Sequence, residues 1–229
     1  MRMSSKKFTD EDLVFASKLT NIDHLDLGYS NISDFGMGIL PKFIRLRTLN
    51  LEYCSGLSDY NFVSIVHLNN LENLNLEGNI TLTCHSIAQI LTLFKLKHLN
   101  LGNLNIIDWN LFIVSKLTCL ESLVLDRSMY ITDRGIANLI KLPNLTDLSI
   151  LNMENMKKRS LSLISEELNL KRLTLFGCYN IKDDSISLFK YFTNLNYLNI
   201  SKTGITDKGY EKLKTYYNTI LHQEIDIIF

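Results

Sequence analysis

The chain has 229 residues, of which 46% are hydrophobic, and its 24 basic and 24 acidic residues give a formal net charge of zero. This balance excludes the strong positive field typical of proteins that bind nucleic acid or an anionic membrane. No apolar run reaches the roughly 18 residues of a membrane-spanning helix, and no apolar stretch follows the basic N-terminus, as a Sec-type signal peptide would require. We therefore expect a cytoplasmic monomer, although other routes of secretion need no such segment.

Four cysteines, Cys54, Cys84, Cys119 and Cys178, are spread along the chain without a CxxC pair or a metal-ligand spacing. A free cysteine behaves as a small hydrophobic residue, and disulfides belong to oxidising compartments. The sequence therefore predicts four reduced, mostly buried thiols, with neither a disulfide framework nor a metal site.

The first predicted element is a helix that begins at Thr9-Asp10, where a hydroxyl can accept from the free N–H groups of the first turn. Apolar residues follow at helical spacing, at Leu13, Ala16 and Leu19. We expect residues 1–21 to form a helical half-repeat that caps the array described next.

From residue 22 to residue 210 the chain repeats itself every 24 or 25 residues. Each copy opens with the pattern LxxLxL, whose alternation predicts a short strand. The eight copies begin at Ile22, Leu46, Leu71, Leu96, Leu120, Leu145, Leu170 and Leu195.

A helix is predicted in the second part of each copy. It begins after an apolar anchor, at a pair such as Ser33-Asp34, Ser58-Asp59, Thr132-Asp133 or Thr206-Asp207, which can cap the helix and suits its dipole. The copy at Leu145 departs from this pattern, because the basic run Lys157-Lys158-Arg159 replaces the pair. We expect its helix to start late or to be replaced by irregular chain, with the basic run in a solvated convex loop or at a secondary contact site.

Residues 211–229 are predicted to cap the other end. A helix is expected around residues 208–217, and Ile225, Ile227 and Phe229 suggest a last strand in slipped register. Glu224 and Asp226 would protect its open edge against aggregation.

The pattern LxxLxLxxC/N followed by ITDxG resembles the leucine-rich repeat family, and within it the cysteine-containing subtype of many F-box adaptor proteins. Cys54, Asn79 and Cys178 occupy the C/N position. The resemblance implies one α/β domain over residues 1–229, a right-handed solenoid with a parallel sheet on its concave side and helices on its convex side. Stacking also follows from physics, since one strand and one helix cannot bury their leucines alone.

The resemblance places the residues between the leucines on the concave face, which is the candidate binding surface. Its N-terminal half is rich in carboxylates and also carries two tyrosines: Asp26, Tyr29, Glu52, Tyr53, Glu77 and Asp126. Its C-terminal half offers apolar and aromatic side chains near two arginines: Val124, Arg127, Leu151, Arg172, Phe176 and Tyr197. Leu151 and Phe176, expected to be exposed in neighbouring repeats, are the strongest candidates because interface anchors tend to be apolar or aromatic.

We expect a protein partner with basic residues for the first half and an apolar anchor for the second. The alternative is that these are ordinary solvated positions and that binding uses a helix face or the ends of the array. The asparagines in the strands are interpreted as structural or solvated. Trp109 is expected to pack into the core or to staple a helix, with an exposed contact residue as the alternative.

Catalytic, cofactor and metal sites are not predicted. Glu52 and Glu77 hold the same rank in adjacent repeats, so their carboxylates could approach to about 5–6 Å, a spacing found in glycosidases. An open concave sheet does not enclose a pocket, however, and His24 and His98 lie three repeats apart, roughly 14 Å, which is too far to share a metal.

The expected function is therefore a non-catalytic protein-protein interaction module. One version is a bacterial effector acting in the cytosol of a host cell, in keeping with an Ile-, Asn- and Lys-rich composition. The other version, drawn from the resemblance, is substrate recognition for a ubiquitin ligase. An F-box would need about 40 residues before the repeats by that resemblance, so this version requires a separate adaptor chain.

Overall fold

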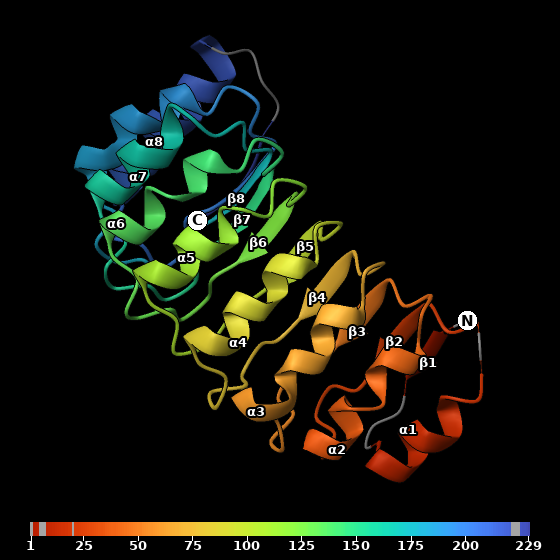
Figure 1. The fold of residues 1–229 in the computed structure, drawn as a ribbon. Coiled ribbons are helices and arrows are strands. Elements are labelled where there is room, and N and C mark those ends of the chain that lie inside the picture. Colours follow the sequence, from red (N-terminus) through yellow and green to blue (C-terminus); the bar gives the residue numbers. More distant parts are fainter. Residues whose placement is uncertain (1, 5–7, 20, 221–224) are drawn as a thin grey trace.

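The computed structural model describes residues 2–4, 8–19, 21–220 and 225–229. Its strands form one parallel ten-stranded sheet in the order of the sequence. Figure 1 shows the strands along one side of a curved array and the helices along the other. The strands are β1 (Arg2–Ser4), β2 (His24–Asp26), β3 (Thr48–Asn50), β4 (Asn73–Asn75), β5 (His98–Asn100), β6 (Ser122–Val124), β7 (Asp147–Ser149), β8 (Arg172–Thr174), β9 (Tyr197–Asn199) and β10 (Asp226–Ile228).

The helical side holds α-helices and shorter 3-10 segments. The α-helices are α1 (Asp10–Ala16), α2 (Asp34–Met37), α3 (Asp59–Phe62), α4 (Cys84–Gln89), α5 (Asp108–Val114), α6 (Asp133–Ile136), α7 (Lys158–Ser165) and α8 (Asp207–Thr215). The 3-10 segments are η1 (Leu40–Lys42), η2 (Val63–His67), η3 (Ile90–Thr92), η4 (Leu139–Lys141) and η5 (Asp183–Tyr191), and a π-helical turn, η6 (Tyr216–Ile220), follows α8.

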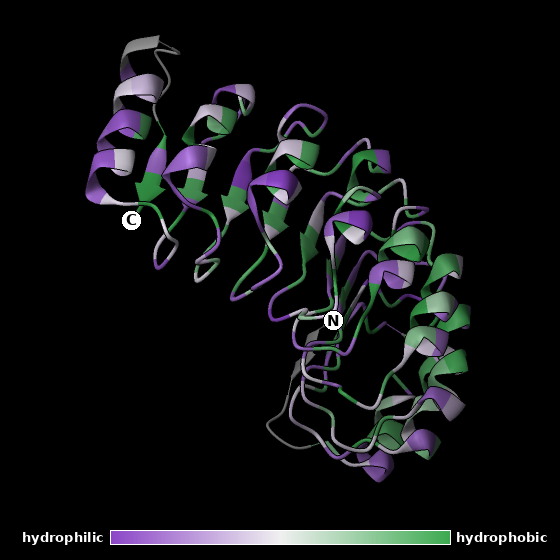
Figure 2. Ribbon diagram, turned by 90° about the vertical axis from the view of Figure 1, so that its left-hand side faces the viewer, coloured by the Kyte–Doolittle hydropathy of each residue, from purple (hydrophilic) through white to green (hydrophobic). Residues whose placement is uncertain are grey.

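The leucines of the repeated pattern form the core between sheet and helices. The central residue of each strand is aligned with that of its neighbour, as Leu99 is with Leu123 and Leu123 is with Leu148. These side chains are fully or almost fully buried, and burial of a leucine contributes roughly 1.5–3 kcal/mol. In Figure 2 the strands and the helices both carry hydrophobic and hydrophilic colours, as expected for elements buried on one side.

An aspartate at the helix start ties most of the described helical segments to the next repeat, whereas Cys84 and Lys158 hold that rank in α4 and α7. The Asp108 carboxylate accepts from the backbone N–H of Thr132 at 2.7 Å and from its hydroxyl at 2.6 Å. Thr132 is itself the cap of α6. We call this arrangement the inter-repeat clasp. Carboxylates accept from both the N–H and the hydroxyl in the pairs Asp10–Ser33, Asp59–Thr83, Asp108–Thr132 and Asp183–Thr206, and from the hydroxyl in the pair Asp34–Ser58.

The glycine of ITDxG provides the space for this carboxylate. A Cβ atom added to Gly135 would lie 2.4 Å from Asp108 Oδ1, and one added to Gly209 would lie 2.2 Å from Asp183 Oδ1. These distances are far below van der Waals contact. The motif ITDxG is therefore the receiving half of a clasp whose aspartate comes from the preceding repeat.

The eighth residue of every repeat has a left-handed backbone. Only glycine adopts this conformation at no steric cost, yet six of the eight residues are not glycine. They are Tyr29, Tyr53, Gly78, Asn103, Arg127, Asn152, Gly177 and Lys202, with φ between 49° and 76°.

The N-terminal end contains more than the expected helix. The helix α1 begins at Asp10 with Thr9 as its cap, as the Thr9-Asp10 pair predicts, and Leu13 is buried. Leu19, expected on the same apolar face, is 38% exposed. The strand β1 extends the sheet beyond β2. It was not expected, because it has only three residues and no leucine pattern marks it.

The C-terminal end was predicted correctly as a strand but wrongly as a slipped one. In β10, Ile227 is aligned with Leu198 of β9 and so continues the row of central residues. The extra length lies in the connection before it, where α8 is followed by η6. Asp226 is exposed at this edge, while Glu224 lies outside the described residues.

The basic run is exposed as expected, but it lies at a helix start and not in a loop. The helix α7 begins at Lys158, the rank that Asp133 holds in the preceding repeat, so it neither starts late nor is lost. Its cap differs instead: the Lys157 N–H donates to Ser160 Oγ at 3.2 Å, and the Ser160 hydroxyl donates to Asp133. A buried serine thus replaces the usual Ser/Thr cap.

The cysteines only partly follow the expectation. Cys54 and Cys178 are buried, and their thiols donate to the carbonyls of Leu27 and Ile150 at 3.1 and 3.2 Å. Burial raises the pKa of both thiols to about 11. Cys84 is half-buried and Cys119 is exposed, so "mostly buried" was wrong for two of the four.

Candidate interaction surface

The concave face is formed by strand side chains that point away from the leucine core. Its centre is a shallow groove over β3 to β6. The exposed or half-buried side chains that line it are polar except for one valine: Thr48, Asn50, Asn73, Asn75, His98, Asn100, Ser122 and Val124. The groove therefore offers donors and acceptors at regular spacing along the sheet.

The asparagines of this groove form a ladder with the predicted carboxylates. Asn50 Nδ2 donates to Asp26 Oδ1 at 2.8 Å, and Asn100 Nδ2 donates to Glu77 Oε2 at 3.0 Å. The side-chain oxygen of Asn100 accepts in turn from the N–H of Gly102, two residues further on, at 2.9 Å. The structural interpretation of the asparagines is therefore confirmed, and the carboxylates are partly engaged within the protein.

Tyr29 and Tyr53 stack at one edge of the concave face. Their ring centroids are 5.3 Å apart and their planes are inclined by 12°. The Tyr29 hydroxyl donates to Glu52 Oε1 at 2.8 Å, which raises the pKa of Tyr29 to about 12. The Tyr53 ring lies over Gly78, where an added Cβ would be 2.4 Å from it, and its hydroxyl accepts from Asn103 Nδ2 at 3.1 Å. The two rings are thus fixed while Tyr29 remains 62% exposed.

Asp126 marks the middle of the face and is engaged internally. Its Oδ1 accepts from the hydroxyl of Ser149 at 2.9 Å and from the backbone N–H of Leu151 at 3.0 Å. Burial raises the pKa of Asp126 despite these two hydrogen bonds, with Glu77 contributing in the same direction. Asp126 therefore positions the backbone at Leu151, and Val124 and Arg127 are the accessible predicted residues beside it.

At the C-terminal end the predicted residues pair with cations. The Arg172 guanidinium lies 4.3 Å from the centre of the Tyr197 ring, and its Nε is 3.4 Å from Asp147 Oδ1. Lys202 Nζ lies 5.0 Å from the centre of the Phe176 ring. Phe176 and Leu151, expected to be exposed, are only half-buried.

The twelve predicted residues thus fall into three groups along the arc. Tyr29, Glu52 and Tyr53 are in mutual contact at the N-terminal end, near Asp26 and Glu77. Asp126 and Leu151 are joined in the middle, beside Val124 and Arg127. Arg172 and Tyr197 are joined at the C-terminal end, with Phe176 as their neighbour in the same repeats.

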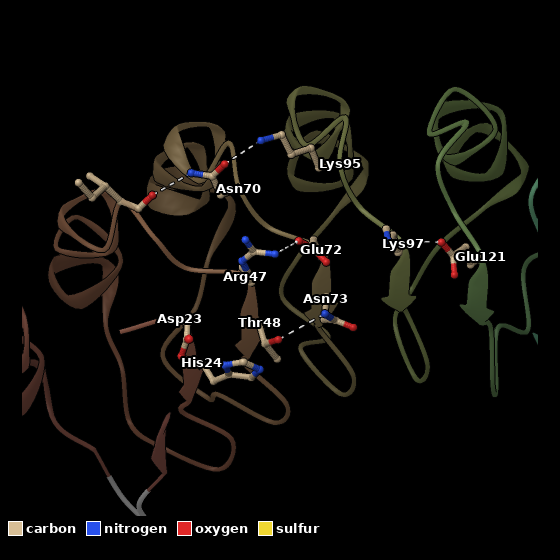
Figure 3. A network of polar contacts seen from close by, with 11 residues as sticks. Asp23, His24, Arg47, Thr48, Asn70, Glu72, Asn73, Lys95, Lys97 and Glu121 are labelled. Carbon is tan, nitrogen blue, oxygen red and sulfur yellow. Dashed lines mark hydrogen bonds and ion pairs between the residues drawn. The ribbon is translucent and has the colours of Figure 1, made fainter. Parts of the chain in front are cut away.

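A row of alternating charges beside the face was not predicted. Arg47 NH1 lies 2.8 Å from Glu72 Oε1, and Lys97 Nζ lies 3.7 Å from Glu121 Oε1. Figure 3 shows these two pairs on neighbouring repeats. The four residues hold the same rank, just before the strands, so the sequence could have revealed them. Such exposed pairs contribute about 0–1 kcal/mol each, and they leave the edge near neutral.

Trp109 was expected to pack into the core or to staple a helix, and this expectation is wrong. Its side chain is 56% exposed at the second position of α5 and stacks on Phe112 with centroids 4.9 Å apart. Trp109 is therefore exposed, as the alternative stated, and its role as a contact residue stays a prediction.

Among the described residues, no cluster of three or more His, Cys, Asp or Glu side chains could hold a metal ion. His24 Nδ1 is 2.9 Å from Asp23 Oδ1 in the adjacent position. None of the helices in the described part of the chain has the length and apolar character needed to cross a membrane.

A parallel sheet of aligned leucines with a helix in each crossover defines an α/β leucine-rich repeat solenoid. Among solved structures the chain is similar to an internalin from Listeria monocytogenes, with a TM-score of 0.56 and 20% sequence identity over 93% of this chain and 68% of that chain. No family model matches the chain, and no curated protein matches it by sequence. The fold is therefore shared with a known repeat protein.

Proposed function

We propose that this chain is a non-catalytic module that binds a protein partner through its concave face. The observation that carries the proposal is the pair Tyr29 and Tyr53, stacked on each other in left-handed backbone three residues after the ends of β2 and β3. A bulky residue in this conformation costs roughly 1–2 kcal/mol. Glycine occupies the same rank at Gly78, so the fold does not demand tyrosine there.

The remaining predicted residues are proposed as contacts around this pair. At the N-terminal end, the carboxylates of Asp26, Glu52 and Glu77 favour basic groups on the partner. Towards the C-terminal end the surface becomes less acidic, and its candidate contacts are Val124, Arg127, Leu151, Arg172, Phe176 and Tyr197. Asp126 is proposed to act by holding Leu151 in place.

The test uses glycine at the left-handed positions. Tyr29→Gly and Tyr53→Gly remove the rings and relieve backbone strain at the same time, so the fold should survive while partner capture falls. Asn152→Gly is the matched control, because it has the same rank and backbone at a distance from the tyrosines. Capture from a host lysate is measured by mass spectrometry, and folding by circular dichroism. Unchanged capture by the double variant would contradict the assignment.

A second pair of variants tests the other half of the face. Leu151→Glu and Phe176→Glu place charge where an apolar anchor is proposed. Loss of capture with an intact circular dichroism spectrum supports the anchor, whereas full capture excludes these two residues from the interface.

Two versions of the function are proposed, the first being an effector of bacterial origin acting in a host cytosol. The second is substrate recognition for a ubiquitin ligase with a separate adaptor chain. What supports the second is the resemblance to the cysteine-containing subtype, since Cys54 and Cys178 hold the C/N position. Recovery of ligase scaffold subunits in the capture experiment favours the ligase version, and recovery of another host protein without them favours the effector version.

The proposal includes a cytoplasmic monomer that uses no cofactor. The competing function is a hydrolase acting through Glu52 and Glu77. Both oxygens of Glu52 are engaged, by the Tyr29 hydroxyl at 2.8 Å and by Asn75 Nδ2 at 3.3 Å, which favours a structural role. Turnover of a glycoside substrate that disappears in the Glu52→Gln, Glu77→Gln double variant would overturn the non-catalytic assignment.

A further inference from the structure

A second exposed row of side chains lies on the convex side, opposite the concave face. It is formed by the second residue of each of four consecutive helices, α2 to α5, which lie side by side in Figure 1. We call it the convex aromatic row, and it consists of Phe35, Tyr60, His85 and Trp109. Phe35 is 65% exposed, Tyr60 82% and Trp109 56%, so most of their surface faces solvent.

The row is confined to the N-terminal half of the array. The same rank in the following helical segments is charged, at Arg134, Arg159, Asp184 and Lys208, and these residues are also exposed. The fold therefore does not require an aromatic side chain at this rank. An aromatic side chain left in water does not contribute the stabilisation that its burial would give. Exposed aromatic residues at the same rank of four consecutive helices therefore indicate an interaction site.

Neighbouring side chains widen the row into a patch. Trp109 stacks on Phe112 one helical turn later. Lys116 Nζ and Lys141 Nζ lie 4.8 and 5.4 Å from the centre of the Phe112 ring. Val63 in η2 and Phe94 after η3 are also exposed. The patch thus combines large apolar surface with cations at the ends of the helices.

The charges at the Trp109 end of the patch are cations, whereas at the other end exposed Glu11 holds the same rank in α1, the helix next to α2. The carboxylates at the helix starts, Asp34, Asp59 and Asp108, are occupied by inter-repeat clasps. Lys116 and Lys141 form no ion pair with the described residues. Their ammonium groups lie against the Phe112 ring, and that of Lys141 also donates to Asn138 Oδ1 at 3.2 Å. A partner segment with apolar side chains for the rings and carboxylates for the lysines would therefore be complementary to the Trp109 end of the patch.

We infer that the convex aromatic row binds an amphipathic protein segment that carries Asp or Glu beside apolar side chains. The apolar side chains would cover Tyr60 and Trp109, and the acidic ones would pair with Lys116 and Lys141. This site is separate from the concave face and does not depend on the function proposed there.

The test measures binding of a fluorescent helical peptide made of Leu, Phe and Glu by fluorescence anisotropy, using the full chain. We expect saturable binding that weakens about tenfold or more in the Tyr60→Ser, Trp109→Ser variant. The Lys116→Glu, Lys141→Glu variant should bind the peptide more weakly than the wild type does. This difference should grow as the ionic strength falls, because less salt screens the repulsion between the glutamates of the variant and of the peptide. A peptide with Lys in place of Glu should not bind.

Matched variants separate this site from others. Lys208→Ser changes the same rank in the charged half, and Leu151→Glu with Phe176→Glu changes the concave face, so both should leave peptide binding unchanged. Equal binding of the Lys peptide, no binding of the Glu peptide, or equal loss in the concave variant would overturn the inference.

Two other occupants are examined with the same variants. Binding to vesicles of phosphatidylserine and phosphatidylcholine that is lost in Tyr60→Ser, Trp109→Ser would assign the row to a membrane surface. Dimerisation in analytical ultracentrifugation that is lost in the same variant would assign it to a second copy of this chain. Either result would overturn the acidic segment.

Discussion

The carboxylate of Asp108 in α5 accepts two hydrogen bonds from Thr132 in the following repeat, at 2.7 Å from the backbone nitrogen and 2.6 Å from the hydroxyl. The same residue pair therefore caps one helix and joins it to the previous one. Coupling between neighbouring repeats largely determines the stability of repeat proteins, so we expect this clasp to matter more than an ordinary surface hydrogen bond.

Replacement of the clasp aspartate should destabilise the array. Asp108→Ala removes an acceptor of two hydrogen bonds, and we expect the free energy of unfolding to fall by about 1–3 kcal/mol. Urea denaturation followed by circular dichroism measures the change. Asp207→Ala is the control, because Asp207 starts the last helix and makes no clasp with the described residues. Equal losses in the two variants would show that only the helix dipole is involved.

A side chain at the clasp glycine should also be harmful. In Gly135→Ala the new Cβ would lie 2.4 Å from Asp108 Oδ1, so we expect a loss of about 1–3 kcal/mol from overpacking. Gly38→Ala is the control, since Gly38 is exposed, has ordinary helical φ and meets its nearest atom at 3.3 Å. It should be neutral or slightly stabilising. If Asp108→Ala does not reduce the penalty of Gly135→Ala, the carboxylate is not the source of the conflict.

The residue type at the C/N position, which Asn79 occupies in its repeat, should affect stability through its hydrogen bonds. Asn79 Nδ2 donates to the carbonyls of Leu51 at 2.7 Å and Leu76 at 2.9 Å, and its Oδ1 accepts from the Cys54 N–H at 3.0 Å. Asn79→Ala leaves these buried groups unsatisfied, and we expect a loss of about 2–4 kcal/mol. Asn79→Cys should lose less, because the thiol of Cys54 donates to a carbonyl at the same rank. Equal losses would indicate that packing alone selects this residue. Thermal unfolding of both variants provides the comparison.

The pH dependence of stability should report on Asp126. Burial raises its pKa in the folded state above the unfolded value, so its contribution to stability is complete below about pH 4 and is lost as the pH rises through the folded pKa. Asp126→Asn retains an acceptor oxygen for Ser149 and Leu151. We therefore expect the stability of Asp126→Asn relative to the wild type to be greater at about pH 7 than at about pH 3. Urea denaturation at both pH values measures this difference.

Asp183 provides the control of opposite sign. Hydrogen bonds from the hydroxyl and then the backbone N–H of Thr206 lower the pKa of Asp183, so its contribution is present above about pH 4 and lost as the pH falls through the folded pKa. Asp183→Asn should be destabilising near pH 7 and nearly neutral near pH 3. A common direction for the two variants would show that the measured changes reflect net charge.

Much of the fold could be predicted because its periodicity is local. The alternation around Leu123 and the Thr132-Asp133 pair indicate a strand and a helix start within one repeat, and both are present. The second role of the aspartates could not be predicted, because it depends on the distance between repeats. The helix at Lys158 was missed because its cap, Ser160, lies three residues after the expected position. The strand β1 was missed because only the neighbouring strand specifies it.

The candidate surface could be predicted in outline but not in detail. Alternation places Glu52 and Leu151 on the concave face. It does not reveal that the Tyr29 hydroxyl donates to Glu52 or that Asp126 accepts from the backbone N–H of Leu151. Left-handed backbone has no common residue type, since both Tyr53 and Gly78 adopt it. The exposure of Trp109 depends on which side of the helix start faces the sheet, and a single tryptophan has no periodicity that would indicate it.

The clasp also gives the array a direction. Each carboxylate belongs to one repeat and each receiving N–H to the next, as in Asp183 and Thr206. Removing a repeat from the C-terminal end leaves a carboxylate that water can solvate, whereas removing one from the N-terminal end deprives the next helix start of its acceptor. Stepwise truncation should therefore be tolerated better from the C-terminus, and local unfolding should spread more readily from the N-terminus towards the middle of the chain.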